Sequence, residues 1–230
     1  MELGTFTEDI VLARAREQYE CGRADVEFEP GATALVVVDM IDEFVKPEWC
    51  PFWVPEATRQ VPRIKALIDA FHEAELPVIH LAYEVGLRGL NFPTTEWIVP
   101  IAQGFEGLEA DLFQKVSFYG PLQPSDEDHV VLKHCYSGFH ATELDLVLKS
   151  LGVRTIVIAG TMSNYCCGAT AREAFWHGYG VVFGSDVTSS DDPELHEAEI
   201  KTLRRGYARI MASDEILAEV AALAPAAATA

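Results

Sequence analysis

Basic residues are scarce in this sequence. Its 230 residues include 17 Lys and Arg against 36 Asp and Glu, which gives a formal net charge of −19. So acidic a chain repels the phosphate backbone of nucleic acids and anionic lipid unless a basic patch is present. Arg204 next to Arg205 is the only adjacent basic pair. We therefore expect no nucleic-acid partner, and we attribute the acidity to solubility.

Long hydrophobic runs are also absent. No apolar segment is long enough to span a bilayer, and the first nine residues lack the basic start and apolar core of a secretory signal. We expect a soluble, cytoplasmic protein without a membrane partner.

Cysteine is sparse and irregularly spaced. The five cysteines, Cys21, Cys50, Cys135, Cys166 and Cys167, include no Cys-x-x-Cys pair. This spacing argues against both a disulfide framework and a zinc cage. We expect five reduced thiols.

The apolar residues are arranged in a pattern typical of an α/β fold. β-branched runs alternate with amphipathic segments, which indicates a parallel sheet covered by helices on both faces. The predicted strands are 34–38, 77–82, 130–132, 155–159, 180–184 and 208–211, and the predicted helices are 57–74, 141–150, 165–177 and 193–204. In the second of these helices, Leu144, Leu146, Val147 and Leu148 are expected to face the sheet.

The chain is predicted to form a single domain, 1–230, because 49% of its residues are hydrophobic and no composition shift divides it. Residues 1–29 are predicted to form a helical arm with an extended lead-in. Residues 84–127 are predicted to form an irregular excursion over the site, and 218–230 an Ala-rich tail.

Cys166 is the most informative residue. It follows the strand 155–159 and opens the helix 165–177, where the positive end of the helix dipole favours a thiolate. It is therefore predicted to be a nucleophile. Cys167 is its nearest rival, but one residue further along a helix the side chain rotates away by about a quarter turn.

Two further reactive side chains follow predicted strands. Asp39 ends the run 34–38 and Lys133 ends the run 130–132, and ligands bind at the carboxyl ends of parallel strands. Alone, the Asp suggests a helix cap, the Lys a solvated charge and the Cys a buried filler. Their joint placement favours a catalytic unit: Cys166 nucleophile, Asp39 base and Lys133 electrostatic partner. Free N–H groups at the helix start would hold an oxyanion, so acyl transfer to water is the predicted reaction.

Three motifs carry a resemblance to a known family. They are an apolar strand ending in Asp39-Met40 before Glu43-Phe44, the run from Lys133 through Tyr136-Ser137 to Leu144, and the run from Gly160 to Arg172 around Cys166. With these, the sequence resembles the isochorismatase-like cysteine hydrolases from about Ala34 to Leu217.

The resemblance implies a three-layer, doubly wound α/β fold with a six-stranded parallel sheet of order 3-2-1-4-5-6. It also implies catalytic roles for Asp39, Lys133 and Cys166, a cis peptide joining Thr161 to Met162, and oxyanion donors in the N–H groups of Met162 and Cys166. A homodimer or homotetramer is the implied assembly.

The metal-binding nicotinamidases of this family carry an Asp-x-His cluster after the second strand, and His80 to Pro100 contains none. No metal and no cofactor are therefore predicted, and His80, His134 and His140 are expected to be structural or exposed. Isochorismatase itself lacks the cysteine and cleaves a vinyl ether, so Cys166 favours an amide, carbamoyl or ureido substrate. The motif is nearest to the ureidoacrylate, carbamoyl and biuret hydrolases. A vinyl-ether hydrolase and a non-catalytic redox-sensing module are the alternatives.

The substrate pocket is the least determined part of the prediction. Aromatic side chains on loops near the three catalytic positions are candidates to wall a small, flat pocket. They are Phe44, Trp49, Trp53, Tyr136, Phe139 and Tyr165. Arg88 is a candidate to bind a substrate carboxylate, or a solvated loop residue. The alternative for the aromatics is that half of them are core or dimer-interface residues.

Overall fold

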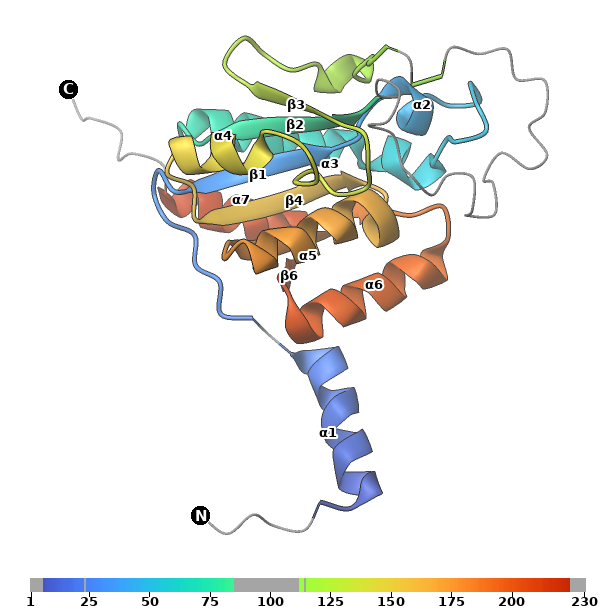
Figure 1. Ribbon diagram of the computed structural model, residues 1–230, viewed down its shortest axis with the longest axis vertical. Helices are drawn as coiled ribbons and strands as arrows, with labels where there is room; N and C mark the ends of the chain where they lie inside the picture. Colours follow the sequence, from blue (N-terminus) through green and yellow to red (C-terminus); the bar gives the residue numbers. More distant parts are fainter. Residues whose placement is uncertain (1–5, 23, 85–111, 114, 224–230) are drawn as a thin grey trace.

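A computed structural model describes residues 6–22, 24–84, 112–113 and 115–223 (Figure 1). Within these ranges six strands form one all-parallel sheet, ordered β3-β2-β1-β4-β5-β6. The strands are β1 (Thr33–Val38), β2 (Val78–Tyr83), β3 (His129–Lys133), β4 (Thr155–Thr161), β5 (Gly180–Ser189) and β6 (Arg209–Met211). The predicted α/β class and the strand order 3-2-1-4-5-6 are confirmed.

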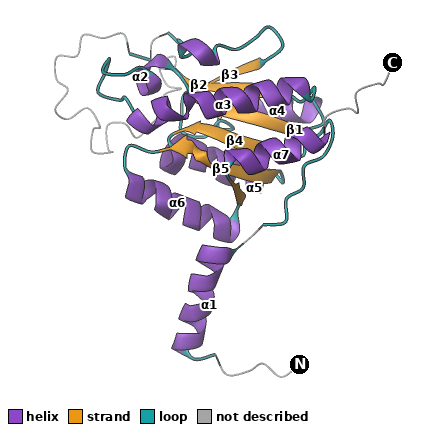
Figure 2. Ribbon diagram, turned by 180° about the vertical axis from the view of Figure 1, so that it is seen from behind, coloured by secondary structure: helices purple, strands orange, loops and turns teal. Residues whose placement is uncertain are grey.

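Helices cover both faces of the sheet, which makes three layers (Figure 2). They are α1 (Glu8–Cys21), α2 (Asp42–Val45), α3 (Pro55–Glu73), α4 (Leu144–Ser150), α5 (Gly168–Trp176), α6 (Pro193–Gly206) and α7 (Ser213–Leu223). α3 and α7 pack on one face through residues such as Ile64, Phe71 and Val220. Helices α4 to α6 pack on the other face through residues such as Leu148 and Leu203.

β1 lies inside the sheet, and its apolar side chains are buried on both faces. All six of its residues are buried, and it pairs with β2 on one side and β4 on the other. Val38, its last residue, lies opposite Leu81 and Gly160. A Cβ on Gly160 would lie 2.0 Å from the Val38 carbonyl oxygen, so this close approach requires glycine. The residue after Val38 therefore emerges between the ends of β2 and β4.

Two predicted helices begin differently in the structure. Within 141–150 the helix begins at Leu144, and only Leu144 and Leu148 are fully buried, because they lie one turn apart. Leu146 is 69% exposed, so the prediction that it faces the sheet is wrong. Within 165–177 a single π-helical turn, η2 (Ser163–Cys167), precedes α5.

The C-terminal prediction also needs correction. Residues 218–223 belong to α7, which buries Ile216 and Val220 against the α3 side of the core, so they are not a tail. Residues 224–230 lie outside the described residues, as does most of the predicted excursion 84–127. The predicted N-terminal arm is present as α1, followed by an extended segment.

A buried histidine of β2 lies beside the carboxylate of Asp128. His80 on β2 is 1% exposed, and its Nε2 lies 3.3 Å from Oδ2 of Asp128. The other oxygen of this carboxylate, Oδ1, lies 2.7 Å from His72 Nε2. Burial lowers the pKa of His80, and the charge of Asp128 opposes this without reversing it. His80 is thus a structural residue that stays neutral near pH 7.

We predict that this protein loses stability as the pH falls below about 6.5, the ordinary pKa of histidine. His80 takes up a proton more readily in the unfolded chain than in the folded one, so its contribution is full above that pH and lost below it. Urea unfolding between pH 7.5 and 5.5 measures this, with a slope of at most about 1.4 kcal/mol per pH unit from one group. His80→Gln is expected to flatten the slope, and an unchanged slope would contradict the assignment.

Candidate active site

Asp39, the first residue after β1, is fully buried. Its backbone adopts φ 50°, and its N–H donates to the Leu81 carbonyl at 2.9 Å. Its Oδ1 accepts the Tyr83 N–H at 2.7 Å. Both bonds come from the adjacent strand β2, so the end of that strand fixes the orientation of the carboxylate.

Lys133, the last residue of β3, is also fully buried, and its ammonium joins three groups. Nζ lies 2.8 Å from Asp39 Oδ2 and donates to Cys166 Sγ at 3.2 Å and to the Cys135 carbonyl at 3.1 Å. Burial acts to lower the pKa of Lys133, but the charges of Asp39 and Cys166 raise it, and the net direction is upward. The ammonium therefore keeps its proton.

Cys166 lies in the π-helical turn that joins β4 to α5, and it is 8% exposed. Burial raises the pKa of the Cys166 thiol, the negative charge of the Asp39 carboxylate raises it further, and the Lys133 ammonium opposes both. The expected direction, a thiol more acidic than a free cysteine, is not the one found: burial and the Asp39 charge together outweigh the Lys133 ammonium. The thiol is protonated at rest and faces a carboxylate that can take its proton.

The turn before Cys166 contains a cis peptide bond between Thr161 and Met162, as predicted. The Met162 carbonyl accepts the N–H groups of Tyr165 at 3.1 Å and Cys167 at 3.0 Å. Cys167 is fully buried in the core shared by α4 to α6. This placement favours Cys166 over Cys167 as the reactive thiol.

Polar contacts from α6, and from the segment before it, hold the turn Ser163–Cys167, which we call the nucleophile turn after the predicted role of Cys166. His196 Nδ1 lies 3.0 Å from Ser163 Oγ, and its Nε2 lies 3.1 Å from the Ser185 carbonyl oxygen. Because a carbonyl only accepts, Nε2 carries the hydrogen, and in the neutral ring Nδ1 accepts the Ser163 hydroxyl. Ser190 donates to Asn164 at 2.8 Å, so two successive residues of the turn are anchored.

An ion pair anchors the other end of this turn. Arg172 on α5 binds both carboxylate oxygens of Glu199 on α6, one of them at 2.9 Å. Gly168 allows the contact, because a Cβ there would lie 2.2 Å from Glu199 Oε1. The α5–α6 ion pair thus fixes the helix that directly follows the turn carrying Cys166.

We predict that His196→Leu lowers kcat while KM changes little. The variant loses the acceptor for Ser163, and small displacements of a nucleophile cost about 10- to 100-fold in rate. His196→Asn keeps an acceptor near the Nδ1 position and is expected to retain most of kcat. Steady-state kinetics with circular dichroism of both variants tests this, and a Leu variant as fast as the parent would refute the positioning role.

Among the predicted pocket residues, Tyr136 and Tyr165 lie together near the sulfur, with ring centroids 5.1 Å apart. Burial raises the pKa of Tyr136, and the neighbouring Tyr165 and Cys166 act in the same direction. Phe44 contacts Phe113 at 5.3 Å in an aromatic cluster beside Tyr83.

Three further pocket candidates, Phe139, Trp49 and Trp53, have contacts with residues other than Asp39, Lys133 and Cys166. Phe139 is 6% exposed and packs against His177 and Tyr179, at the end of α5 opposite to Cys166, so it is a core residue. Trp49 is exposed beneath the Lys46 ammonium, and Trp53 Nε1 donates to Thr58 on α3. Arg88 lies outside the described residues.

Tyr83 is a site residue that the sequence analysis missed. Besides holding Asp39 through its N–H, it pairs with Lys133 in the sheet, and its ring centroid lies 5.4 Å from Lys133 Nζ. Burial raises its pKa, so the hydroxyl stays neutral. Only its position at the end of β2, between the ends that carry Asp39 and Lys133, signals its role.

In the described part of the chain, no group of three or more His, Cys, Asp or Glu side chains is arranged to hold a metal ion. His134 lies on the site loop, with Nδ1 2.9 Å from the Glu84 carbonyl, and His140 is exposed. No helix among the described residues is both long and apolar enough to cross a membrane.

The sheet order and the buried Asp39–Lys133–Cys166 cluster define a class, the isochorismatase-like α/β hydrolases. Comparison with known families agrees, because the Isochorismatase domain matches residues 33–215. The chain therefore belongs to the isochorismatase family.

Individual relatives support this membership. An uncharacterized isochorismatase family protein of Bacillus subtilis, YwoC, is 30% identical over 82% of this chain and 94% of its own length. The ureidoacrylate amidohydrolase RutB of Acinetobacter baylyi is 28% identical over 78% of this chain and 80% of its own length. The crystal structure of a cysteine hydrolase from Pseudomonas syringae superposes with a TM-score of 0.77, at 26% identity, over 87% of this chain and 98% of the other.

Proposed function

We propose that this protein is a metal-independent cysteine amidohydrolase. Its substrate is a small amide, carbamoyl or ureido compound, whose C–N bond is cleaved through a thioester with release of ammonia. The observation that carries the proposal is the Lys133 ammonium in contact with both Asp39 and the Cys166 sulfur. The similarity to an amidohydrolase of ureidoacrylate supports a C–N bond as the target.

The first half of the reaction forms the thioester. Asp39 takes the proton of Cys166, whose raised pKa means that the thiolate forms only with this base at hand. The thiolate, paired with Lys133, attacks the substrate carbonyl, and the N–H groups of Met162 and Cys166 hold the oxyanion. The tetrahedral intermediate collapses as Asp39 returns the proton to the departing nitrogen.

The second half releases the acid. Asp39, again a carboxylate, takes a proton from water, and the hydroxide attacks the thioester carbonyl. Collapse breaks the C–S bond, and the proton on Asp39 returns to the sulfur. Lys133 keeps its proton throughout and stabilises each anionic state of the sulfur and the carboxylate.

A panel of substrates tests the proposal. Ammonia release is measured over primary amides, N-carbamoyl compounds and ureido acids, with pyruvate release from isochorismate measured in parallel. Turnover of one C–N class, with no pyruvate, is expected. Pyruvate release without ammonia would establish the vinyl-ether alternative. Stoichiometric alkylation of Cys166 without turnover of any compound would favour a redox role.

A further inference from the structure

The N-terminal helix α1 projects away from the body of the protein (Figures 1 and 2). None of its 14 residues is buried. The part distant from the body is apolar, with Phe6, Ile10, Val11 and Leu12 between 41% and 55% exposed. An isolated helix of this length is marginal in water, so its stability depends on packing.

Among the described residues, polar contacts from the C-terminal end of α6 hold the last turn of α1. Arg204 Nη1 donates to the Glu20 carbonyl at 3.2 Å, and Lys201 Nζ pairs with the Glu20 carboxylate at 2.9 Å. The Arg205 guanidinium lies 4.5 Å from the centroid of the Tyr19 ring. The arm therefore has a defined direction, while the apolar side chains of its tip stay about half exposed, with the Arg14 guanidinium 5.5 Å from the centroid of the Phe6 ring.

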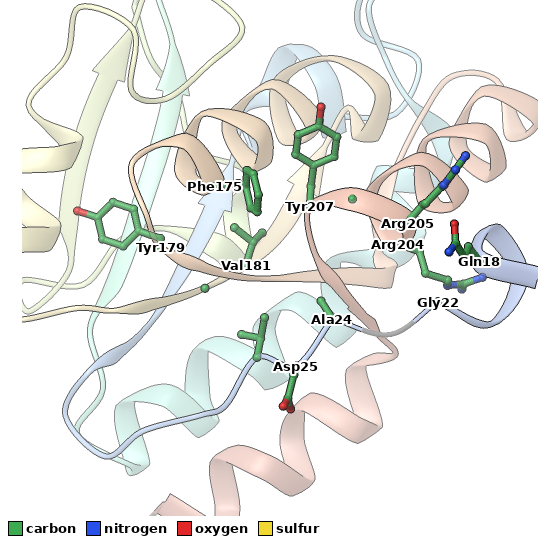
Figure 3. Close-up of a pocket in the computed structure, with 13 residues that line it drawn as sticks. Gln18, Gly22, Ala24, Asp25, Phe175, Tyr179, Val181, Arg204, Arg205 and Tyr207 are labelled. Carbon is green, nitrogen blue, oxygen red and sulfur yellow. The ribbon is translucent and has the colours of Figure 1, made fainter. Parts of the chain in front are cut away.

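An open cavity of about 530 Å³ lies where the arm meets the body (Figure 3). We call it the crook. Phe175 from α5 and Tyr207 after α6 lie on one side of it, and Arg204, Gln18 and Gly22 lie on the other. Phe175 is 46% exposed, and its neighbour Trp176 is 69% exposed. The crook thus combines exposed aromatic surface with the arginine pair of α6.

Tip and crook are complementary in chemistry. The tip carries Phe6 and Ile10 beside the acidic first turn, Glu8 and Asp9, whereas the crook offers aromatic rings beside Arg204 and Arg205. A helix of 14 residues is about 21 Å long, so the tip of a straight arm cannot enter the crook at its own root. The tip of a second copy meets no such limit.

We propose that two copies of this chain exchange arms around a twofold axis, each tip packing into the crook of the other. Such an isologous contact buries the same patches on both subunits and leaves neither arm uncovered. The proposed contact lies at the C-terminal end of α6, whereas the nucleophile turn is contacted by His196 near its N-terminal end. The exchange of arms and the hydrolytic activity can therefore be tested separately. The occupant of the crook is a second copy of this chain.

Light scattering after size exclusion tests the proposal. The expected mass is twice the chain mass of 25.4 kDa. Ile10→Asp combined with Val11→Asp is expected to give the monomer, because two charges replace the apolar tip. Leu146→Asp, at an exposed leucine on α4, is the matched control and is expected to stay dimeric. A monomeric parent, or an arm variant that stays dimeric, would overturn the exchange.

Cross-linking between two differently labelled chains identifies the contact. In a Cys21→Ser background, Phe6→Cys chains are mixed with Phe175→Cys chains and mildly oxidised. A disulfide-linked dimer that contains one chain of each kind is expected, and either chain oxidised alone should yield much less. Equal yields from the mixed and unmixed samples would refute the pairing of tip with crook.

Discussion

Replacing Cys166 with alanine is expected to abolish hydrolysis, with kcat reduced by at least about 10³-fold. The sulfur is the only group in the proposed scheme that bonds to the substrate, so no neighbouring residue replaces it. The fold should persist, because the change removes one atom from a side chain in the turn beyond the carboxyl end of β4. Ammonia release and thermal unfolding of the variant measure the two expectations.

Cys167→Ala is the matched control for this experiment. It removes a thiol from the next residue, which is fully buried in the core and is given no chemical role. We expect a modest loss of stability and retention of most of the activity. If the alanine variant at 167 were inactive while that at 166 still turned over, the assignment of the nucleophile would be reversed.

Replacing Lys133 with methionine is expected to destabilise the protein by about 3–5 kcal/mol, because it leaves the Asp39 carboxylate buried without its cation. The melting temperature should fall on the order of 10 °C. Activity should also be lost, since the thiolate loses its counter-charge. Urea unfolding and differential scanning calorimetry provide the measurements.

Two further variants separate the buried charge from general damage. Asp39→Asn combined with Lys133→Met removes both charges and should recover much of the lost stability, while remaining inactive. Lys149→Met removes an exposed lysine paired with Asp145 on α4, and a change below about 1 kcal/mol is expected. A double variant no more stable than Lys133→Met would mean that packing, not charge, dominates at this position.

The sequence alone predicted the strands that are buried on both faces, because runs such as 34–38 consist of apolar residues with no alternation. It missed the extension of β5 to Ser189, because four of the five residues after Gly184 are polar and the paired ones lie opposite the end of β4. It also missed α7, since its Ala-rich composition resembles a tail, although Ile216 and Val220 pack against the core.

At the site, the convergence of Asp39, Lys133 and Cys166 was predictable because each stands at or just beyond a strand end. The direction of the thiol pKa was not, because it depends on burial that only the assembled sheet creates. Tyr83 was missed for the same reason: its importance comes from its neighbours across the sheet, not from any local pattern. The pocket aromatics were uncertain because loop sequences do not encode where a ring points.

Strand order also restricts which amino acid serves at position 133. β2 lies between β1 and β3, so the Lys133 ammonium reaches the Asp39 carboxylate across a whole intervening strand. Two strand spacings amount to about 9.6 Å, a span that needs the four-carbon stem of lysine. A histidine at the same position would stop short of the carboxylate. The width of one β-strand thus requires a long cationic side chain at position 133.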